Sequence, residues 1–265
     1  MGYEIIYPSG SSAEKPIIIH IPHCSTCIPA RYRHEICLGD AELTAELLAM
    51  TDRFTDQLFG QATRYGATLF VNGVSRLVMD PERFPDDHEE PMAAKGMGAV
   101  YVSTSNGRPL RATSFSAQDR QQVMHELYWP YSHAFHKLVL DNLNQFGKCL
   151  VIDAHSFPSR ALPYEDENLL RPDICFGYDV FHKPMELLEV LESICADEGL
   201  TTAHNQPFSG SYVPTGYYRS DRRVHSLMIE VKRSLYMDEA LGVKSVNYSR
   251  FAHMLGRLIR SIGST

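Results

Sequence analysis

Two short segments that are far apart in the chain each combine an apolar run with a histidine. His23 follows the run at residues 16–21 (PIIIHI), and His155 follows the run at residues 149–153 (CLVID). Imidazole nitrogens are common ligands of divalent metals, and a catalytic zinc typically has two histidines, one carboxylate and an open position for water. We therefore expect one site for zinc, or another divalent metal, that uses both histidines. The alternative is that His155 is a hydrogen-bonded histidine of the core and that His23 is an unrelated loop residue.

Two acidic residues are candidates for the third ligand. Asp52 is the first choice, and Asp56, one helical turn later, is the reserve. The alternative for both is a place on the solvated face of an amphipathic helix. Asp153 stands two residues before His155, and this Asp-x-His spacing is typical of a carboxylate that fixes the orientation of a ligating imidazole.

Glu230 is an acidic residue inside an otherwise apolar run at residues 226–231 (SLMIEV). Burying an unpaired carboxylate costs several kcal/mol, so we expect Glu230 to be paired, bound to metal or raised in pKa. A carboxylate with a raised pKa beside an activated water can act as a general base. The alternative is a structural ion pair with Arg233.

Three arginines could bind the carboxylates of a substrate. Arg76 and Arg83 belong to a charged cluster at residues 72–83, and Arg160 follows His155. The planar guanidinium group suits bidentate binding of a carboxylate. We expect these arginines to lie near the ends of strands, beside the metal site.

The pattern of apolar residues predicts the elements that position these groups. Strands alternate with amphipathic helices, which predicts an α/β fold: one three-layer domain over residues 1–265, with a mainly parallel mixed sheet and helices on both faces. Ligands of such sheets collect at the carboxyl ends of the strands, where the two histidines fall. The predicted strands are residues 16–21, 67–71, 149–153, 174–177 and 226–231, and the predicted helices are residues 40–64, 116–146, 183–198 and 238–262.

Two long segments fit neither pattern. Residues 84–110 are rich in Pro, Gly, Asp and Glu, and residues 205–223 are rich in Gly, Ser, Tyr and Pro. Loops of this length inside a compact domain commonly carry function. We expect both loops to lie over the site.

Composition excludes several classes of function. A net charge of -7 without a basic stripe argues against nucleic acid as a partner, and a Gly-rich phosphate-binding motif is absent. Neither a membrane span nor a signal peptide is expected, so we interpret the protein as cytoplasmic, a monomer or small homo-oligomer that acts on a small molecule. Six scattered cysteines suit reduced thiols, and the isolated pair Cys24 and Cys27 does not favour structural zinc or redox chemistry.

The motifs resemble those of the N-formylglutamate amidohydrolase family, in the same order and over nearly the whole chain. The resemblance implies a zinc carboxypeptidase-like fold and a zinc hydrolase that converts N-formyl-L-glutamate to formate and L-glutamate in histidine degradation. It also implies zinc ligands His23, Asp52 and His155, with Glu230 as base, Tyr212 in the substrate pocket, and Asp80 and Asp153 supporting the ligands. The matching segments are residues 22–25 (PHCS), 51–56 (TDRFTD), 74–83 (VSRLVMDPER), 153–156 (DAHS), 210–212 (GSY) and 229–231 (IEV).

The chain also departs from the usual pattern of that family. Glu82 stands before Arg83 where the family often has Asn, and the Arg that often follows the position of Thr215 is absent. The alternatives are the same chemistry on another N-acyl amino acid or small peptide, or a metal-binding relative without turnover.

Overall fold

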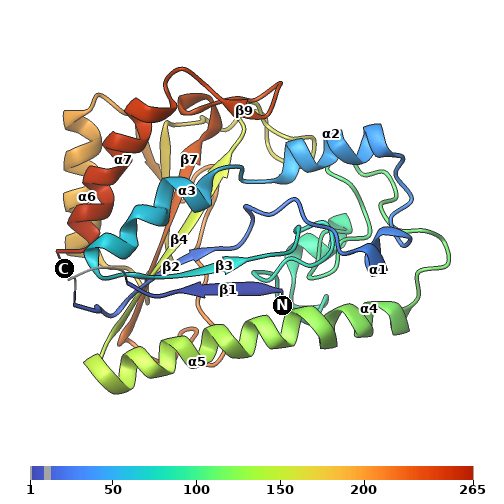
Figure 1. The fold of residues 1–265 in the computed structure, drawn as a ribbon, viewed down its shortest axis with the longest axis horizontal. Coiled ribbons are helices and arrows are strands. Elements are labelled where there is room, and N and C mark those ends of the chain that lie inside the picture. Colours follow the sequence, from blue (N-terminus) through green and yellow to red (C-terminus); the bar gives the residue numbers. More distant parts are fainter. Residues whose placement is uncertain (1, 9–12, 265) are drawn as a thin grey trace.

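Seven strands form one mixed sheet at the centre of the protein (Figure 1). The computed structural model describes residues 2–8 and 13–264. The strand order is β1-β3-β2-β4-β7-β5-β6. The strands are β1 (Tyr3–Ile6), β2 (Ile17–Ile21), β3 (Thr68–Asn72), β4 (Cys149–Phe157), β5 (Ile174–Gly177), β6 (Thr202–His204) and β7 (Val224–Lys232).

The four central strands, β3, β2, β4 and β7, pair in parallel. At one edge β1 runs antiparallel to β3, and at the other β5 runs antiparallel to β7 and carries β6 in parallel. The predicted mainly parallel mixed sheet is therefore confirmed. That residues 1–265 form a single domain stays a prediction.

Helices cover both faces of the sheet, which gives the three layers that were predicted (Figure 1). The helices α4 and α5 lie along one face, and α3, α6 and α7 lie on the other. The helices are α1 (Ala30–Arg33), α2 (Asp40–Met50), α3 (Thr55–Gly60), α4 (Ala117–Val123), α5 (Trp129–Phe146), α6 (Met185–Asp197) and α7 (Tyr248–Ile262). Shorter elements are η1 (Gln61–Tyr65), η2 (Pro91–Lys95), η3 (Met124–Tyr128), η4 (Arg233–Leu235), β8 (Met237–Asp238) and β9 (Val243–Lys244).

Strand β2 shows why a continuous apolar run forms the middle of this sheet. Its five residues are all buried, and successive side chains point to opposite faces. Ile17 and Ile19 pack in the core under α3 and α7, whereas Ile18 packs in the core under α5. A strand covered on both faces needs mostly apolar residues, which is the pattern that predicted it, and His20 is the one polar residue of β2.

Two predicted helices are wrong in their extent. The helix expected over residues 40–64 is interrupted after Met50, and α3 begins only at Thr55. Phe54 adopts a left-handed conformation with φ of 70°, which cannot continue an α-helix. The helix expected over 238–262 begins only at Tyr248, because the preceding residues form the small hairpin of β8 and β9. In the described part of the chain, no helix is long and apolar enough to cross a membrane.

Candidate metal centre

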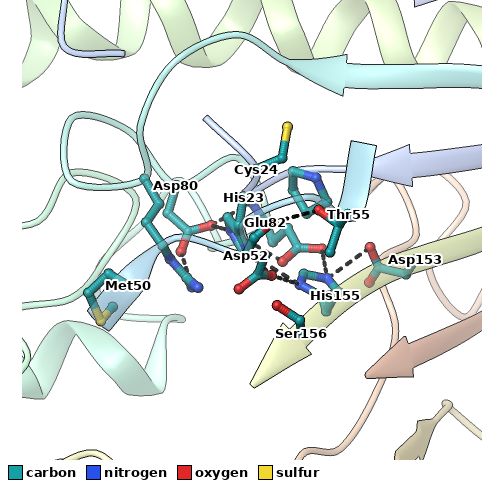
Figure 2. A network of polar contacts seen from close by, with 12 residues as sticks. His23, Cys24, Met50, Asp52, Thr55, Asp80, Glu82, Asp153, His155 and Ser156 are labelled. Carbon is teal, nitrogen blue, oxygen red and sulfur yellow. Dashed lines mark hydrogen bonds and ion pairs between the residues drawn. The ribbon is translucent and has the colours of Figure 1, made fainter. Parts of the chain in front are cut away.

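His23 and Asp52 are brought together by the backbone. His23 lies two residues after β2, and Asp52 lies in the interruption between α2 and α3. The backbone N–H of Asp52 donates a hydrogen bond of 3.0 Å to the carbonyl oxygen of His23. Asp52 was expected on a helix but lies between two helices. At this position its side chain points toward His23 (Figure 2).

His155 comes from the neighbouring strand. Strand β4 continues to Phe157 rather than ending at Asp153, so His155 lies within the strand. Asp153 and His155 are two residues apart and share one face of the sheet, and His155 is in register with Glu230 of β7. The two central strands therefore place a histidine and a carboxylate side by side.

Three ligand atoms converge at one point (Figure 2). His155 Nδ1 lies 3.2 Å from His23 Nδ1 and 3.1 Å from Asp52 Oδ2, and His23 Nδ1 lies 3.8 Å from the same Asp52 oxygen. Tetrahedral zinc with bonds of about 2.0–2.1 Å separates its ligand atoms by roughly 3.3 Å. The donor set and its spacing fit a zinc ion. Among the described residues, Asp56 belongs to no such group.

Carboxylates hold the outer nitrogens of both imidazoles. His23 Nε2 lies 2.9 Å from Asp80 Oδ1, and His155 Nε2 lies 3.1 Å from Asp153 Oδ1. With Nε2 donating to a carboxylate, each ring presents the lone pair of Nδ1 to the centre. Asp80 and Asp153 thus lie beside the outer nitrogens of His23 and His155.

Asp52 is held by a buried cation. The guanidinium of Arg233 donates to Asp52 Oδ1 at 2.9 Å, and both side chains are almost fully buried. Burial alone would raise the pKa of Asp52, but His155 and Arg233 lower it to about 2. Asp52 is therefore ionised, as a metal ligand requires.

Replacing Arg233 by methionine is expected to lower the free energy of unfolding of the metal-free protein by about 3–5 kcal/mol, because it leaves the buried carboxylate of Asp52 uncompensated. Urea denaturation of the chelated protein measures this change. Arg160 is exposed, so Arg160→Met should stay within about 0.5 kcal/mol of the original protein. An equally small effect for Arg233→Met would contradict the role given to this ion pair.

Glu230 faces the site without a partner for one of its oxygens. Its side chain is buried, and no hydrogen bond from the described residues reaches Oε2. Burial raises the pKa of Glu230 to about 8. The guanidinium of Arg233 instead donates to Asp52, Ser156 and the carbonyl of Ala49. The geometry therefore favours a base over a structural ion pair with Arg233.

A cavity of about 620 Å³ opens onto these groups. Residues of both long loops line it, as expected, from Phe84 to Lys95 and from Pro207 to Tyr218. Arg76, Arg83 and Tyr212 also line it, whereas Arg160 is exposed and is not among the lining residues described. The structure thus brings two of the three predicted arginines to the site.

The two arginines share one anchor. Arg76 donates to Asp80 Oδ2 at 2.8 Å, and Arg83 Nε lies 3.5 Å from the same oxygen. Arg83 Nε makes no hydrogen bond within the described residues. Both guanidinium groups are therefore held at the cavity wall by one carboxylate.

Two polar residues near the candidate metal centre were not predicted as site residues. Glu82 lies between the imidazoles, with Oε1 3.1 Å from His155 Nε2 and Oε2 3.5 Å from His23 Nε2 (Figure 2). His20, in the middle of β2, lies 2.9 Å from Asp153 Oδ1. A histidine inside an apolar strand is the same signal that identified Glu230, and it could have identified His20.

Comparison with known proteins places the chain in a family. The family model described as N-formylglutamate amidohydrolase matches residues 15–237. The chain is 30% identical to an N-formylglutamate deformylase of Pseudomonas aeruginosa over 233 residues, which are 84% of this chain and 83% of that protein. The chain belongs to the N-formylglutamate amidohydrolase family. A deformylase of the same name from Pseudomonas putida is also 30% identical, over 84% of this chain and 82% of that protein.

Solved structures agree on the fold. A crystal structure of N-formylglutamate amidohydrolase from Ralstonia eutropha superposes with a TM-score of 0.86 and 22% identity, over 99% of this chain and 97% of that chain. A gene product of Agrobacterium tumefaciens superposes with a TM-score of 0.67 and 20% identity, over 98% of this chain and 96% of that chain. The N-formylglutamate amidohydrolase family and its α/β fold, both expected from the sequence, are confirmed.

Proposed function

We propose that the protein is a zinc-dependent amidohydrolase that converts N-formyl-L-glutamate to formate and L-glutamate, the reaction of histidine degradation. The proposal rests on the convergence of two imidazole nitrogens and one carboxylate oxygen beside a buried carboxylate, at the wall of a cavity. The names of the relatives from Pseudomonas support the formyl substrate.

Each residue has a defined role in this reaction. His23, Asp52 and His155 would hold the zinc ion, which supplies a Lewis acid for the amide carbonyl and lowers the pKa of a bound water. Glu230 accepts a proton from the attacking water and returns it to the leaving nitrogen. Water thus adds to the carbonyl carbon, the C–N bond breaks, and the amine leaves with the proton.

Substrate carboxylates are assigned to the arginines of the cavity wall. Arg83 and Arg76 both line the cavity and lie at the shared anchor Asp80. Two guanidinium groups at one position can bind a carboxylate by paired hydrogen bonds. Tyr212 also lines the cavity, where its backbone N–H donates to Asp153 and its ring stacks on His20.

The first experiment combines metal analysis with an assay of formate release. Purified protein should hold about one zinc per chain and should release formate from N-formyl-L-glutamate. Chelation should stop the release, and zinc should restore it. A protein that binds zinc without releasing formate from any N-formyl amino acid would contradict the proposed reaction.

The arginines predict selectivity for an acidic side chain. N-formyl-L-glutamate should exceed N-formyl-L-glutamine in kcat/KM by well over tenfold, because an amide leaves a guanidinium poorly paired at a cost on the order of 2–5 kcal/mol. Arg83→Gln should reduce this ratio, whereas exposed Arg160→Gln should preserve it. Equal rates, or a preference for N-formyl-methionine, would remove the glutamate assignment and leave the amidohydrolase intact.

A further inference from the structure

Glu82 is a carboxylate at the cavity wall whose ion-pair partners are imidazoles rather than a lysine or arginine. It lies 3.1 Å from His155, 3.5 Å from His23 and 3.6 Å from His20. Its side chain is 15% exposed, and it lines the cavity. Glu82 is therefore close to the candidate ligands and also within reach of a bound molecule.

The nitrogens around Glu82 have better-placed acceptors. A neutral imidazole has one N–H. His23 has its Nε2–H at 2.9 Å from Asp80, and His20 has Nδ1 at 2.9 Å from Asp153. His155 Nε2 lies 3.1 Å from both Asp153 Oδ1 and Glu82 Oε1, so the two carboxylates share the hydrogen of one nitrogen. The imidazoles thus leave Glu82 with acceptor capacity for a further donor.

Two other carboxylates of the cavity wall, Glu90 and Glu165, have committed donors. Glu90 accepts the backbone N–H groups of Phe84 and Met92. Glu165 pairs with Arg171 at 2.7 Å. A mostly buried carboxylate without such a donor is costly unless a ligand supplies one. Glu82 is therefore placed to accept an N–H from a molecule bound in the cavity.

We infer that Glu82 forms an ammonium subsite, so that this protein also hydrolyses amino acids whose acyl group carries an α-ammonium, such as glycyl amino acids. The inference rests on the proposed amide hydrolysis. In it, glycyl-L-glutamate and water give glycine and L-glutamate: water adds to the carbonyl carbon, the C–N bond breaks, and a water proton ends on the leaving nitrogen. A formyl carbon bears only hydrogen and offers Glu82 no donor, whereas an α-ammonium adds an N–H donor one carbon away from the carbonyl.

The rest of the cavity fits such a zwitterion. Arg76 and Arg83 supply donors for a carboxylate, and Glu82 supplies an acceptor for an ammonium, and all three side chains line the same cavity. A volume of about 620 Å³ exceeds what a formyl amino acid needs. Pockets of about 300–1,000 Å³ commonly hold larger molecules. The cavity therefore has room for a longer acyl group.

The test compares glycyl-L-glutamate with N-propionyl-L-glutamate, which has the same shape and a methyl group in place of the ammonium. In the zinc-loaded protein, kcat/KM should favour the glycyl compound about 10- to 100-fold, the range of one hydrogen bond to a charged group. Calorimetry on the chelated protein should show a lower Kd for the glycyl compound than for the propionyl compound. Glu82→Gln should bring both ratios close to one.

A charge-matched control separates the subsite from the general charge of the cavity. Asp166 is exposed and lines the same cavity, so Asp166→Asn removes one negative charge and should preserve both ratios. Equal kcat/KM and Kd for the two compounds in the original protein, together with formate release from N-formyl-L-glutamate, would overturn the subsite and leave the proposed function standing. Failure to hydrolyse any of these amides would overturn the proposed function, whereas a Kd preference lost in Glu82→Gln would still support the subsite. A second zinc per chain that is lost in Glu82→Gln would overturn the subsite by making Glu82 a metal ligand.

Discussion

Replacing Glu230 by glutamine is expected to lower kcat for amide hydrolysis by at least ~100-fold, the usual cost of losing a general base. Glutamine keeps the shape of the side chain and removes its basicity. Because Glu230 Oε2 makes no hydrogen bond within the described residues, the substitution breaks none there. Steady-state rates of formate release measure the effect, and elemental analysis should show unchanged zinc.

A matched substitution isolates the role of position 230. Glu89 is exposed in the loop after β3 and is not among the residues that line the cavity. Glu89→Gln should leave kcat within about twofold of the original value, since exposed substitutions have small effects. Near-normal turnover in Glu230→Gln would contradict the role of general base and favour a structural role for Glu230.

Removing either histidine ligand is expected to abolish stoichiometric zinc and hydrolysis together. His23→Ala and His155→Ala each leave two of the three protein ligands, and catalytic zinc sites normally use three. Elemental analysis after dialysis against a weak chelator measures the loss. Far-UV circular dichroism should stay unchanged, because a chain of 265 residues can bury its core without a metal.

The control for this experiment is His253, which is exposed on α7. His253→Ala should retain zinc and activity. If the double variant His23→Ala/His155→Ala kept one zinc per chain, the candidate centre would be wrong. Zinc that survives only one of the two single substitutions would contradict a shared site.

The sequence predicted the centre of the fold better than its edges. The runs that form β2, β4 and β7 are apolar because both faces of these strands are covered, and this pattern is visible without a structure. The edge strands β1 and β6 were missed, since they have only four and three residues and no fully buried run. Short edge strands depend on pairing with a neighbour more than on their own pattern.

The candidate site was predictable where a histidine or a carboxylate follows or interrupts an apolar strand. His23, His155 and Glu230 follow or interrupt apolar runs, and the structure brings them together. Asp52 was expected on a helix, and its true position depends on the backbone of Phe54, which no periodicity reveals. Arg160 was expected near a strand end like Arg76 and Arg83. In the structure it is exposed and is not among the described residues that line the cavity.

The hydrogen bond from the Asp52 amide to the carbonyl of His23 determines how the metal-free protein behaves. Asp52 cannot move away from His23 unless this buried bond opens, so folding itself sets the spacing of the ligands. In the metal-free protein, His155 Nδ1 lies within hydrogen-bond distance of Asp52 and His23, at 3.1 and 3.2 Å, so a hydrogen on this nitrogen joins the three side chains. A metal ion must displace that hydrogen, so metal binding releases a proton and is favoured as the pH rises. Because the ligand atoms are already in place, binding requires no ordering of the chain, and the binding free energy is not reduced by an entropic cost of assembling the site.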